Sequence, residues 1–150
     1  MCLPLSHDGY ARLHAPIEIV EEFWDAMRRS DLAALNLLLD DDVRWENVGL
    51  PTVRGQATVM RALSSLNLPG AGFDVTIHRI TANGNTVMTE RTDVVIVGPL
   101  HIAFWVCGVT ELSDSGTLTL WRDYADVWNI TKGLARGILG ILVPTLRPEL

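Results

Sequence analysis

The sequence has only two cysteines and four histidines among its 150 residues. Cys2 lies near the N-terminus and Cys107 lies within an apolar segment with strand character, so a disulfide framework or a cysteine-based metal site is not expected. The four histidines are scattered and lack the spacing that is typical of a zinc site. The sequence therefore predicts a site without metal.

Clusters of basic residues and long apolar runs are also missing. No run of lysine or arginine exceeds two residues, and the formal net charge is -6. This charge argues against a nucleic acid or an anionic membrane surface as the partner. No segment reaches about 18 uninterrupted apolar residues, the length of a membrane span. The N-terminus also lacks a charged region followed by an apolar stretch, so no signal peptide is expected. A cytoplasmic protein is the default expectation.

Hydrophobic residues, by contrast, make up 48% of the sequence, and five residues are tryptophan. This is enough for a buried core in one domain that spans residues 1–150. Residues 1–14 are expected to form a loose leader. Helical spacing of apolar side chains predicts helices that begin at Pro16 and Leu32, and a third helix over about 56–66. The acidic run at 40–42 is expected to be a solvated turn that ends the second helix.

Alternating polar and apolar residues predict five strands. The expected ranges are 43–48, 73–81, 85–97, 101–112 and 117–128. Asn83 and Gly84 favour a hairpin turn between the second and third of these strands. An apolar closing helix follows over about 131–142 and is expected to pack in the core or in a dimer interface. This order indicates an α+β fold with a curved, mainly antiparallel sheet wrapped around helices.

Charged residues interrupt the apolar face of two of these strands. Arg91 and Asp93 project from the same face of the strand at 85–97, where charges are costly unless they are paired. A structural ion pair is one interpretation. If Asp123 in the last strand joins them, the site holds two carboxyl groups and one guanidinium. One acid should then keep a proton while the other stays ionised, which is the division that general acid–base catalysis requires.

The register of the strands tests whether these groups can meet. Four-residue hairpin loops would place Asp93 opposite Val106 and Val106 opposite Asp123, with the two aspartate backbones about 10 Å apart. Arg91 would lie opposite Gly108, and its side chain could cross the glycine to reach both carboxyl groups. A β-bulge at Gly108 explains the glycine equally well. The same face carries an apolar set suited to a lipophilic ligand or to an ordinary core: Val95, Phe104, Val106 and Ala125.

Three short motifs resemble the limonene-1,2-epoxide hydrolase family, and most closely its mycobacterial-type members. The motifs are Trp45-Glu46-Asn47, Thr89-Glu90-Arg91-Thr92-Asp93 and Trp121-Arg122-Asp123-Tyr124. The resemblance extends from about residue 17 to residue 127 and includes the stretches 77–80 and 104–109. It implies the cone-shaped fold that nuclear transport factor and ketosteroid isomerase relatives share, and it implies a homodimer.

The resemblance also implies a reaction in which a small lipophilic epoxide is opened to a vicinal diol in one step, without a cofactor or a covalent intermediate. Asp123 would take a proton from the attacking water, and protonated Asp93 would donate to the leaving epoxide oxygen. Arg91 would bridge the two acids, and Asn47 would orient the water. The family usually has a tyrosine where this chain has Trp45, whose indole N–H can donate to the water but cannot accept. Alternatively, Trp45 only packs.

Two other functions remain open. An isomerase or polyketide-cyclase-like enzyme of the same fold would use one aspartate as a base towards a carbon acid, but it would leave the second acid unexplained. A dimer that binds a small ligand without turnover is the third possibility.

Overall fold

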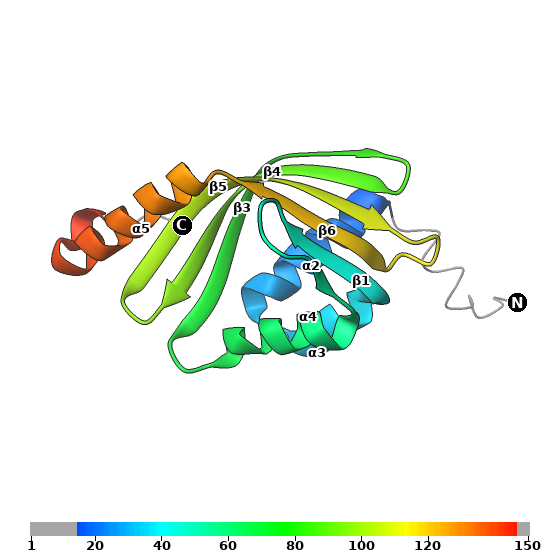
Figure 1. Cartoon of the computed structure of the whole chain (residues 1–150), viewed down its shortest axis with the longest axis horizontal. Helices are drawn as coiled ribbons and strands as arrows, with labels where there is room; N and C mark the ends of the chain where they lie inside the picture. Colours follow the sequence, from blue (N-terminus) through cyan, green and yellow to red (C-terminus); the bar gives the residue numbers. More distant parts are fainter. Residues whose placement is uncertain (1–14, 147–150) are drawn as a thin grey trace, which may run out of the picture.

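The computed structural model describes residues 15–146, which contain one curved six-stranded sheet with the strand order β2-β1-β6-β5-β4-β3 (Figure 1). The strands are β1 (Leu39–Asn47), β2 (Val53–Arg54), β3 (Ala71–Asn83), β4 (Thr86–Val97), β5 (Leu100–Leu112) and β6 (Leu118–Ala125). Strands β3 to β6 form an antiparallel meander, β1 joins β6 in parallel, and β2 pairs antiparallel with β1. The predicted meander and the α+β class are confirmed, whereas β2 was not predicted.

Three helices and a short 3₁₀ helix cover the concave face of the sheet (Figure 1). They are α2 (Pro16–Arg29), α3 (Leu32–Leu38), α4 (Gln56–Leu63) and η1 (Ser64–Asn67). The predicted starts at Pro16 and Leu32 are confirmed, and Asp31 caps α3 by accepting a hydrogen bond from the Ala34 amide. The third helix begins at the predicted residue but ends three residues early, where the chain tightens into η1. The predicted leader at 1–14 lies outside the described residues.

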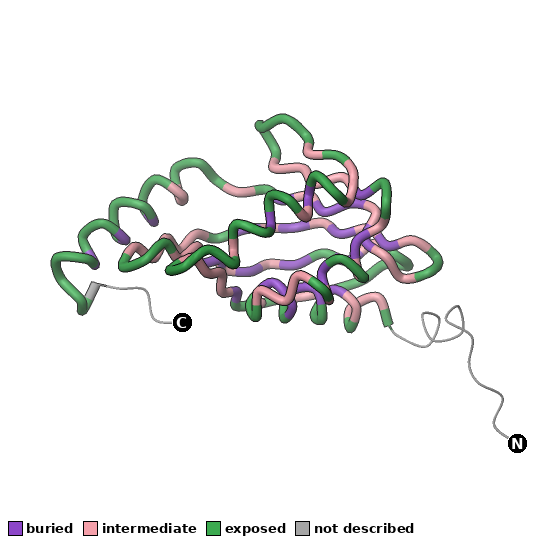
Figure 2. Tube along the Cα trace, turned by 90° about the horizontal axis from the view of Figure 1, so that it is seen from below, coloured by how far each residue is buried: buried purple, intermediate pink, exposed green. Residues whose placement is uncertain are grey.

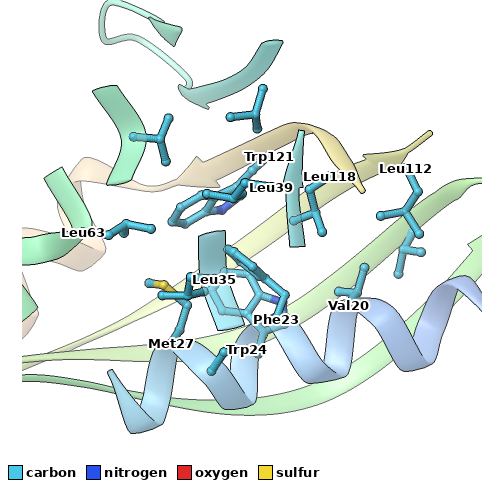
Figure 3. Close-up of a cluster of buried hydrophobic side chains, with 14 of the residues drawn as sticks. Val20, Phe23, Trp24, Met27, Leu35, Leu39, Leu63, Leu112, Leu118 and Trp121 are labelled. Carbon is cyan, nitrogen blue, oxygen red and sulfur yellow. The ribbon is translucent and has the colours of Figure 1, made fainter. Parts of the chain in front are cut away.

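The core lies between α2 and the sheet and is rich in aromatic rings (Figure 3). Phe23 of α2 contacts Trp24 edge-on, with ring centroids 4.9 Å apart, and Trp121 of β6, with centroids 5.1 Å apart. Both tryptophans are almost fully buried. Such edge-to-face packing suits the charge distribution of aromatic rings. The helical stripe that the sequence predicted on α2 therefore packs on the concave face of the sheet.

The acidic run Asp40–Asp42 is not a turn, because β1 already begins at Leu39. Leu39 pairs with Leu118 of β6, and the register then shifts before Arg44 pairs with Leu120. Asp41 and Asp42 stay exposed at this irregular part of the strand, so the extended backbone requires no burial of their charges. Pairing with a distant strand therefore overrides the local turn preference of the three aspartates.

The two hairpins that carry the site have a different register from the predicted one. Asp93 lies opposite Phe104 and Arg91 opposite Val106, because the loop between β4 and β5 contains only Gly98 and Pro99. In the next hairpin Gly108 lies opposite Asp123, and a β-bulge lies between Glu111 and Leu112. These pairings are displaced by two residues from the predicted ones. Because side chains alternate with a period of two, the displacement leaves every side chain on its predicted face.

The closing helix α5 (Val127–Leu142) begins four residues before the predicted start, because Asp126 accepts a hydrogen bond from the Trp128 amide. Strand β6 ends at Ala125, opposite Val106, so residues 100–105 of β5 have no partner in β6. Helix α5 packs against this part of β5. A Cβ atom on Gly133 would collide with the Ala103 carbonyl oxygen, so only glycine permits this approach.

Apart from the glycine contact, α5 is not part of the core. Its buried residues are glycines: Gly133, Gly137 and Gly140. Most of the helix is exposed (Figure 2), including apolar side chains that were expected to be buried in the core or in a dimer interface. Leu134, Ile138, Leu139 and Leu142 are 40%, 51%, 51% and 77% exposed. Core packing of this helix was therefore a wrong expectation for the described chain.

Candidate active site

Arg91 is completely buried and holds both aspartates. Its Nε donates to Oδ1 of Asp93 at 2.8 Å, and its Nη2 donates to Oδ2 of the same carboxyl group at 3.1 Å. Nη2 also donates to Oδ1 of Asp123 at 2.6 Å, and Nη1 donates to Oγ1 of Thr89 at 3.2 Å. The guanidinium group thus brings together the three charged residues that the sequence singled out. Thr89 was not predicted, although it lies on the same face of the strand.

Gly108 provides the space for the Arg91 side chain. A Cβ atom there would collide with Nη1 of Arg91 and would lie 3.0 Å from Oδ1 of Asp123 and 3.1 Å from Oγ1 of Thr89. The irregularity of β5 lies between Glu111 and Leu112 rather than at Gly108. The glycine therefore permits a close approach of the arginine and does not mark a bulge, although the predicted pairing of Arg91 with Gly108 is wrong.

Trp24 of α2 covers the guanidinium group from the helical side. The Cζ atom of Arg91 lies 4.0 Å from the centroid of the Trp24 ring, which is a cation–π contact. The sequence placed Trp24 on the buried stripe of α2 but gave no sign of this contact. The two carboxyl groups and the aromatic face offset the cost of burying this cation.

Burial makes both acids harder to ionise. Loss of solvation raises the pKa of Asp93 to about 6, although Arg91 acts in the opposite direction, and the nearby Asp123 adds to the rise. Burial also raises the pKa of Asp123, against the lowering effects of Arg91 and Trp121. For Arg91, burial favours the neutral form, but the two carboxyl groups outweigh it and raise the pKa. The arrangement therefore stabilises one cation with one anion and one neutral acid.

The indole groups of Trp121 and Trp45 lie next to the acids. Nε1 of Trp121 donates to Oδ2 of Asp123 at 2.8 Å, a contact that the sequence did not predict. Trp45 stacks on Trp121 with ring centroids 4.6 Å apart and an interplanar angle of 12°. Its own Nε1 is buried and has no hydrogen-bond partner. Asn47 lies beside Asp123 in the parallel pairing of β1 with β6.

A cavity of about 190 Å³ lies in front of the two aspartates. Asp93, Asp123, Trp45 and Asn47 line it, whereas Arg91 lies behind the acids and does not reach it. The four apolar residues that the sequence proposed as a pocket all line the cavity: Val95, Phe104, Val106 and Ala125. The remaining lining residues were not predicted as part of a pocket: Met27, Ala62, Leu63, Ser65, Leu66, Phe73 and Trp121. Met27 and Leu63 have the helical spacing that is typical of core residues, so the sequence could not separate the cavity wall from the core.

Residues 15–146 contain no group of three or more histidine, cysteine, aspartate or glutamate side chains that could hold a metal ion. Within the same range no helix is both long enough and apolar enough to cross a bilayer. Cys107 is a free thiol in β5, and Cys2 lies outside the described residues.

Comparison with known proteins identifies relatives of this chain. The family model described as the limonene-1,2-epoxide hydrolase catalytic domain matches residues 14–136. The epoxide hydrolase EphG of Mycobacterium tuberculosis is 46% identical over 134 residues, which are 87% of each chain.

Solved structures agree with this assignment. An LEH-like epoxide hydrolase of M. tuberculosis superimposes with a TM-score of 0.86 and 45% identity, over 90% of this chain and 95% of that chain. A SnoaL-like polyketide cyclase from Shewanella denitrificans shares only the fold, with a TM-score of 0.72, 16% identity and coverage of 80% and 96%. The cone-shaped fold is therefore confirmed, and the chain belongs to the limonene-1,2-epoxide hydrolase family.

Proposed function

We propose that this protein hydrolyses a small lipophilic epoxide to a vicinal diol by direct attack of water. The observation that carries the proposal is one buried arginine that binds two carboxyl groups at the end of a mainly apolar cavity. An epoxide oxygen leaves poorly as an alkoxide, so the reaction needs an acid at that oxygen and a base for the water. Two acids with unequal protonation provide both.

In this mechanism the ionised carboxylate of Asp123 removes a proton from water, and the water oxygen attacks an epoxide carbon. The bond between this carbon and the epoxide oxygen breaks, and Asp93 gives its proton to that oxygen. The site begins and ends with one neutral acid, one carboxylate and the cation of Arg91. Its net charge therefore does not change during the reaction, which keeps the electrostatic cost low in a buried site. Transfer of the proton back to Asp93 restores the enzyme.

Asn47 and Trp45 are proposed to position the water. Asn47 lies beside Asp123 on β1, and both Asn47 and Trp45 line the cavity. The indole N–H of Trp45 has no partner but is buried, so it can donate a hydrogen bond to the attacking water only if the ring turns towards the cavity, while the water donates to Asp123. If Asn47 presents its carbonyl oxygen, the water would have one donor, Trp45, and two acceptors, Asp123 and Asn47. The tryptophan would thus take the place of the tyrosine that the family usually has.

An isomerase or cyclase reaction is the alternative among enzymes. An enzyme described as epoxide hydrolase/cyclase-like, SalBIII, shares the fold with a TM-score of 0.69 and 17% identity. A carbon-acid base would need only one aspartate, whereas here Arg91 holds two aspartates that both reach the cavity. This geometry favours hydrolysis over isomerisation and over binding without turnover.

The deciding experiment measures diol formation from a panel of lipophilic epoxides in ¹⁸O-labelled water. Wild type is compared with Asp123→Asn, and Asp114→Asn in an exposed turn serves as the matched control. We expect labelled diol from wild type and from the control, and none from Asp123→Asn. In a single turnover with excess enzyme the diol should also carry the label. Unlabelled diol there would indicate a covalent ester and contradict direct attack, and an isomerised product without diol would favour the alternative.

We also propose that the protein is a homodimer. Exposed apolar side chains on the outer side of α5, such as Leu139, and on the outer face of the sheet, such as Met88, support this. Light scattering after size exclusion should give twice the chain mass. Leu139→Glu and Met88→Glu then test the two surfaces separately, and a monomeric wild type would contradict the proposal.

The cytoplasmic location and the absence of a metal or cofactor stay predictions, to be tested by cell fractionation and by activity after dialysis against a chelator.

A further inference from the structure

The two carboxyl groups of the site differ in where their hydrogen-bond donors come from. Asp93 accepts two N–H groups, both from Arg91. Asp123 accepts only one N–H group from Arg91, and its other oxygen accepts from the indole of Trp121. With the tryptophan each carboxyl group has two donors. Without it, Asp123 would have one donor against two for Asp93, and the shared proton would favour Asp123.

The indole N–H of Trp121 is held in this direction by rings on three sides. Trp45 stacks on it at 4.6 Å, Phe23 contacts it edge-on at 5.1 Å, and Trp24 contacts it edge-on at 5.7 Å. Only 4% of Trp121 is exposed. Since a ring packed in this way cannot turn without disturbing its neighbours, the donor is pre-organised before any substrate binds.

No charged group near the site favours ionisation of Asp123 over ionisation of Asp93. Arg91 on β4 contacts both carboxyl groups, and Asp93 itself is the only other acid in contact with Arg91 among the described residues. The neighbours on the flanking strands are neutral, since Gly108 pairs with Asp123 on β5 and Asn47 pairs with it on β1. The hydrogen bond from the indole of Trp121 therefore distinguishes Asp123 from Asp93, and no neighbouring charge has the same effect.

We propose that Trp121 is a positioning residue whose N–H keeps Asp123 ionised and thereby leaves the shared proton on Asp93. The inference rests on the proposed function, because it assigns the base and the acid of that same site. Burial raises the pKa of Asp123, and the hydrogen bond from Trp121 opposes this rise, in the direction that the assignment requires. Trp121 transfers no proton itself, and because its ring also lines the cavity, its role through Asp123 is tested by the pH profile and not by the rate alone.

The test is the substitution Trp121→Phe, which keeps a packed ring but removes the donor. We expect the acid limb of the pH profile of kcat/KM to move to higher pH, because Asp123 then protonates more readily. At a pH on that limb the variant should lose about tenfold or more in kcat/KM, as expected when a hydrogen bond to a charged group is lost. Phe23→Leu is the control, because it loosens the same ring cluster without removing a donor. It should leave the acid limb in place.

A second measurement does not depend on turnover. The carboxyl carbons of the aspartates are followed by ¹³C NMR against pH in wild type and in Trp121→Phe, with Asp123 assigned through Asp123→Asn. We expect the titration of Asp123 to move to higher pH in Trp121→Phe. If Trp121→Phe does not fold, the indole N–H signal of Trp121 is followed by NMR instead. This signal should shift with pH in wild type, and the shift should be absent in Asp123→Asn.

The possible outcomes separate this inference from the proposed function. Diol formation by wild type with an unmoved acid limb in Trp121→Phe would overturn the role of Trp121 and leave the hydrolase proposal intact. Absence of diol from every epoxide would count against the hydrolase proposal, while an altered titration of Asp123 would still support the effect of the tryptophan. An unaltered titration of Asp123 would overturn the inference in either case.

Discussion

Nη2 of Arg91 lies 2.6 Å from Oδ1 of Asp123, although the two residues are 32 positions apart in the chain. The same nitrogen lies 3.1 Å from Oδ2 of Asp93. One nitrogen atom with two N–H bonds therefore links the two acids of the proposed reaction. A lysine at this position would provide a point charge without the planar set of donors.

Arg91→Lys should therefore abolish most of the activity. We expect a loss of at least about a hundredfold in kcat, because the two acids would no longer be held with different protonation. The measurement is diol formation under saturating substrate. Arg79→Lys, at an exposed arginine that pairs with Glu90 away from the cavity, is the matched control and should retain activity. Equal loss in both variants would contradict the bridging role.

The activity should fall as the pH rises through about 6. Asp93 must carry a proton to donate to the epoxide oxygen, and burial raises its pKa to about 6. The acid is protonated below this pH and progressively loses its proton above it, so the basic limb of the kcat/KM profile should begin near this value. Asp93→Asn, which cannot act as the acid, should be inactive across the range. A wild-type rate that is constant or rises between pH 6 and 8 would contradict Asp93 as the acid.

Gly108→Ala should disturb the site without changing the fold. The new methyl group would collide with Arg91, whose guanidinium is fixed by hydrogen bonds to three side chains. We expect a loss of about 1–3 kcal/mol in the free energy of unfolding, which is typical of overpacking, together with reduced activity. Urea unfolding and diol formation measure the two effects.

Gly72→Ala is the control for this substitution. It adds the same methyl group to β3, where the nearest atoms would lie 3.6 Å away on Ile96. Its effect on stability should be small. If Gly108→Ala is as stable and as active as Gly72→Ala, neither stability nor activity depends on the close approach of Arg91 to Gly108.

The contact between α5 and β5 should depend on Gly137. A side chain there would collide with the His101 carbonyl oxygen, so Gly137→Val should release the helix from the strand. Hydrogen exchange should then increase in α5 and in residues 100–105 of β5, which have no partner in β6. Leu142→Ala, at a side chain that is 77% exposed, is the control and should leave exchange unchanged. Unchanged exchange in Gly137→Val would show that the helix does not depend on this contact.

Much of the site could be predicted from strand alternation alone. Arg91 and Asp93 had to lie on one face of β4, because side chains alternate along an extended backbone, and Asp123 shares that face in any register that is wrong by an even number of residues. The predicted register was wrong by two residues in both hairpins, since loop length depends on where the strands stop and on a bulge that leaves no clear sign in the sequence. An error of one residue would have moved the acids to opposite faces.

Other features depend on contacts between distant parts of the chain. Asp40–Asp42 were expected to form a turn, but the pairing of Leu39 and Arg44 on either side with β6 keeps them extended. The closing helix was expected in the core or in a dimer interface, but the end of β6 leaves β5 without a partner, and the glycine side of α5 packs there. Neither outcome follows from composition or periodicity, because both depend on where another strand begins or ends.

The sequence by itself determined which residue types share a face and hence which chemistry is possible: two acids and one arginine in an apolar surrounding. Only the tertiary structure decided how the donors are distributed. It placed Trp24 against the guanidinium, aimed the N–H of Trp121 at Asp123, and left a cavity in front of the acids instead of filling it with core side chains. The physical reason is that alternation is local and acts within each strand, whereas hydrogen-bond direction and packing depend on side chains that different elements bring together.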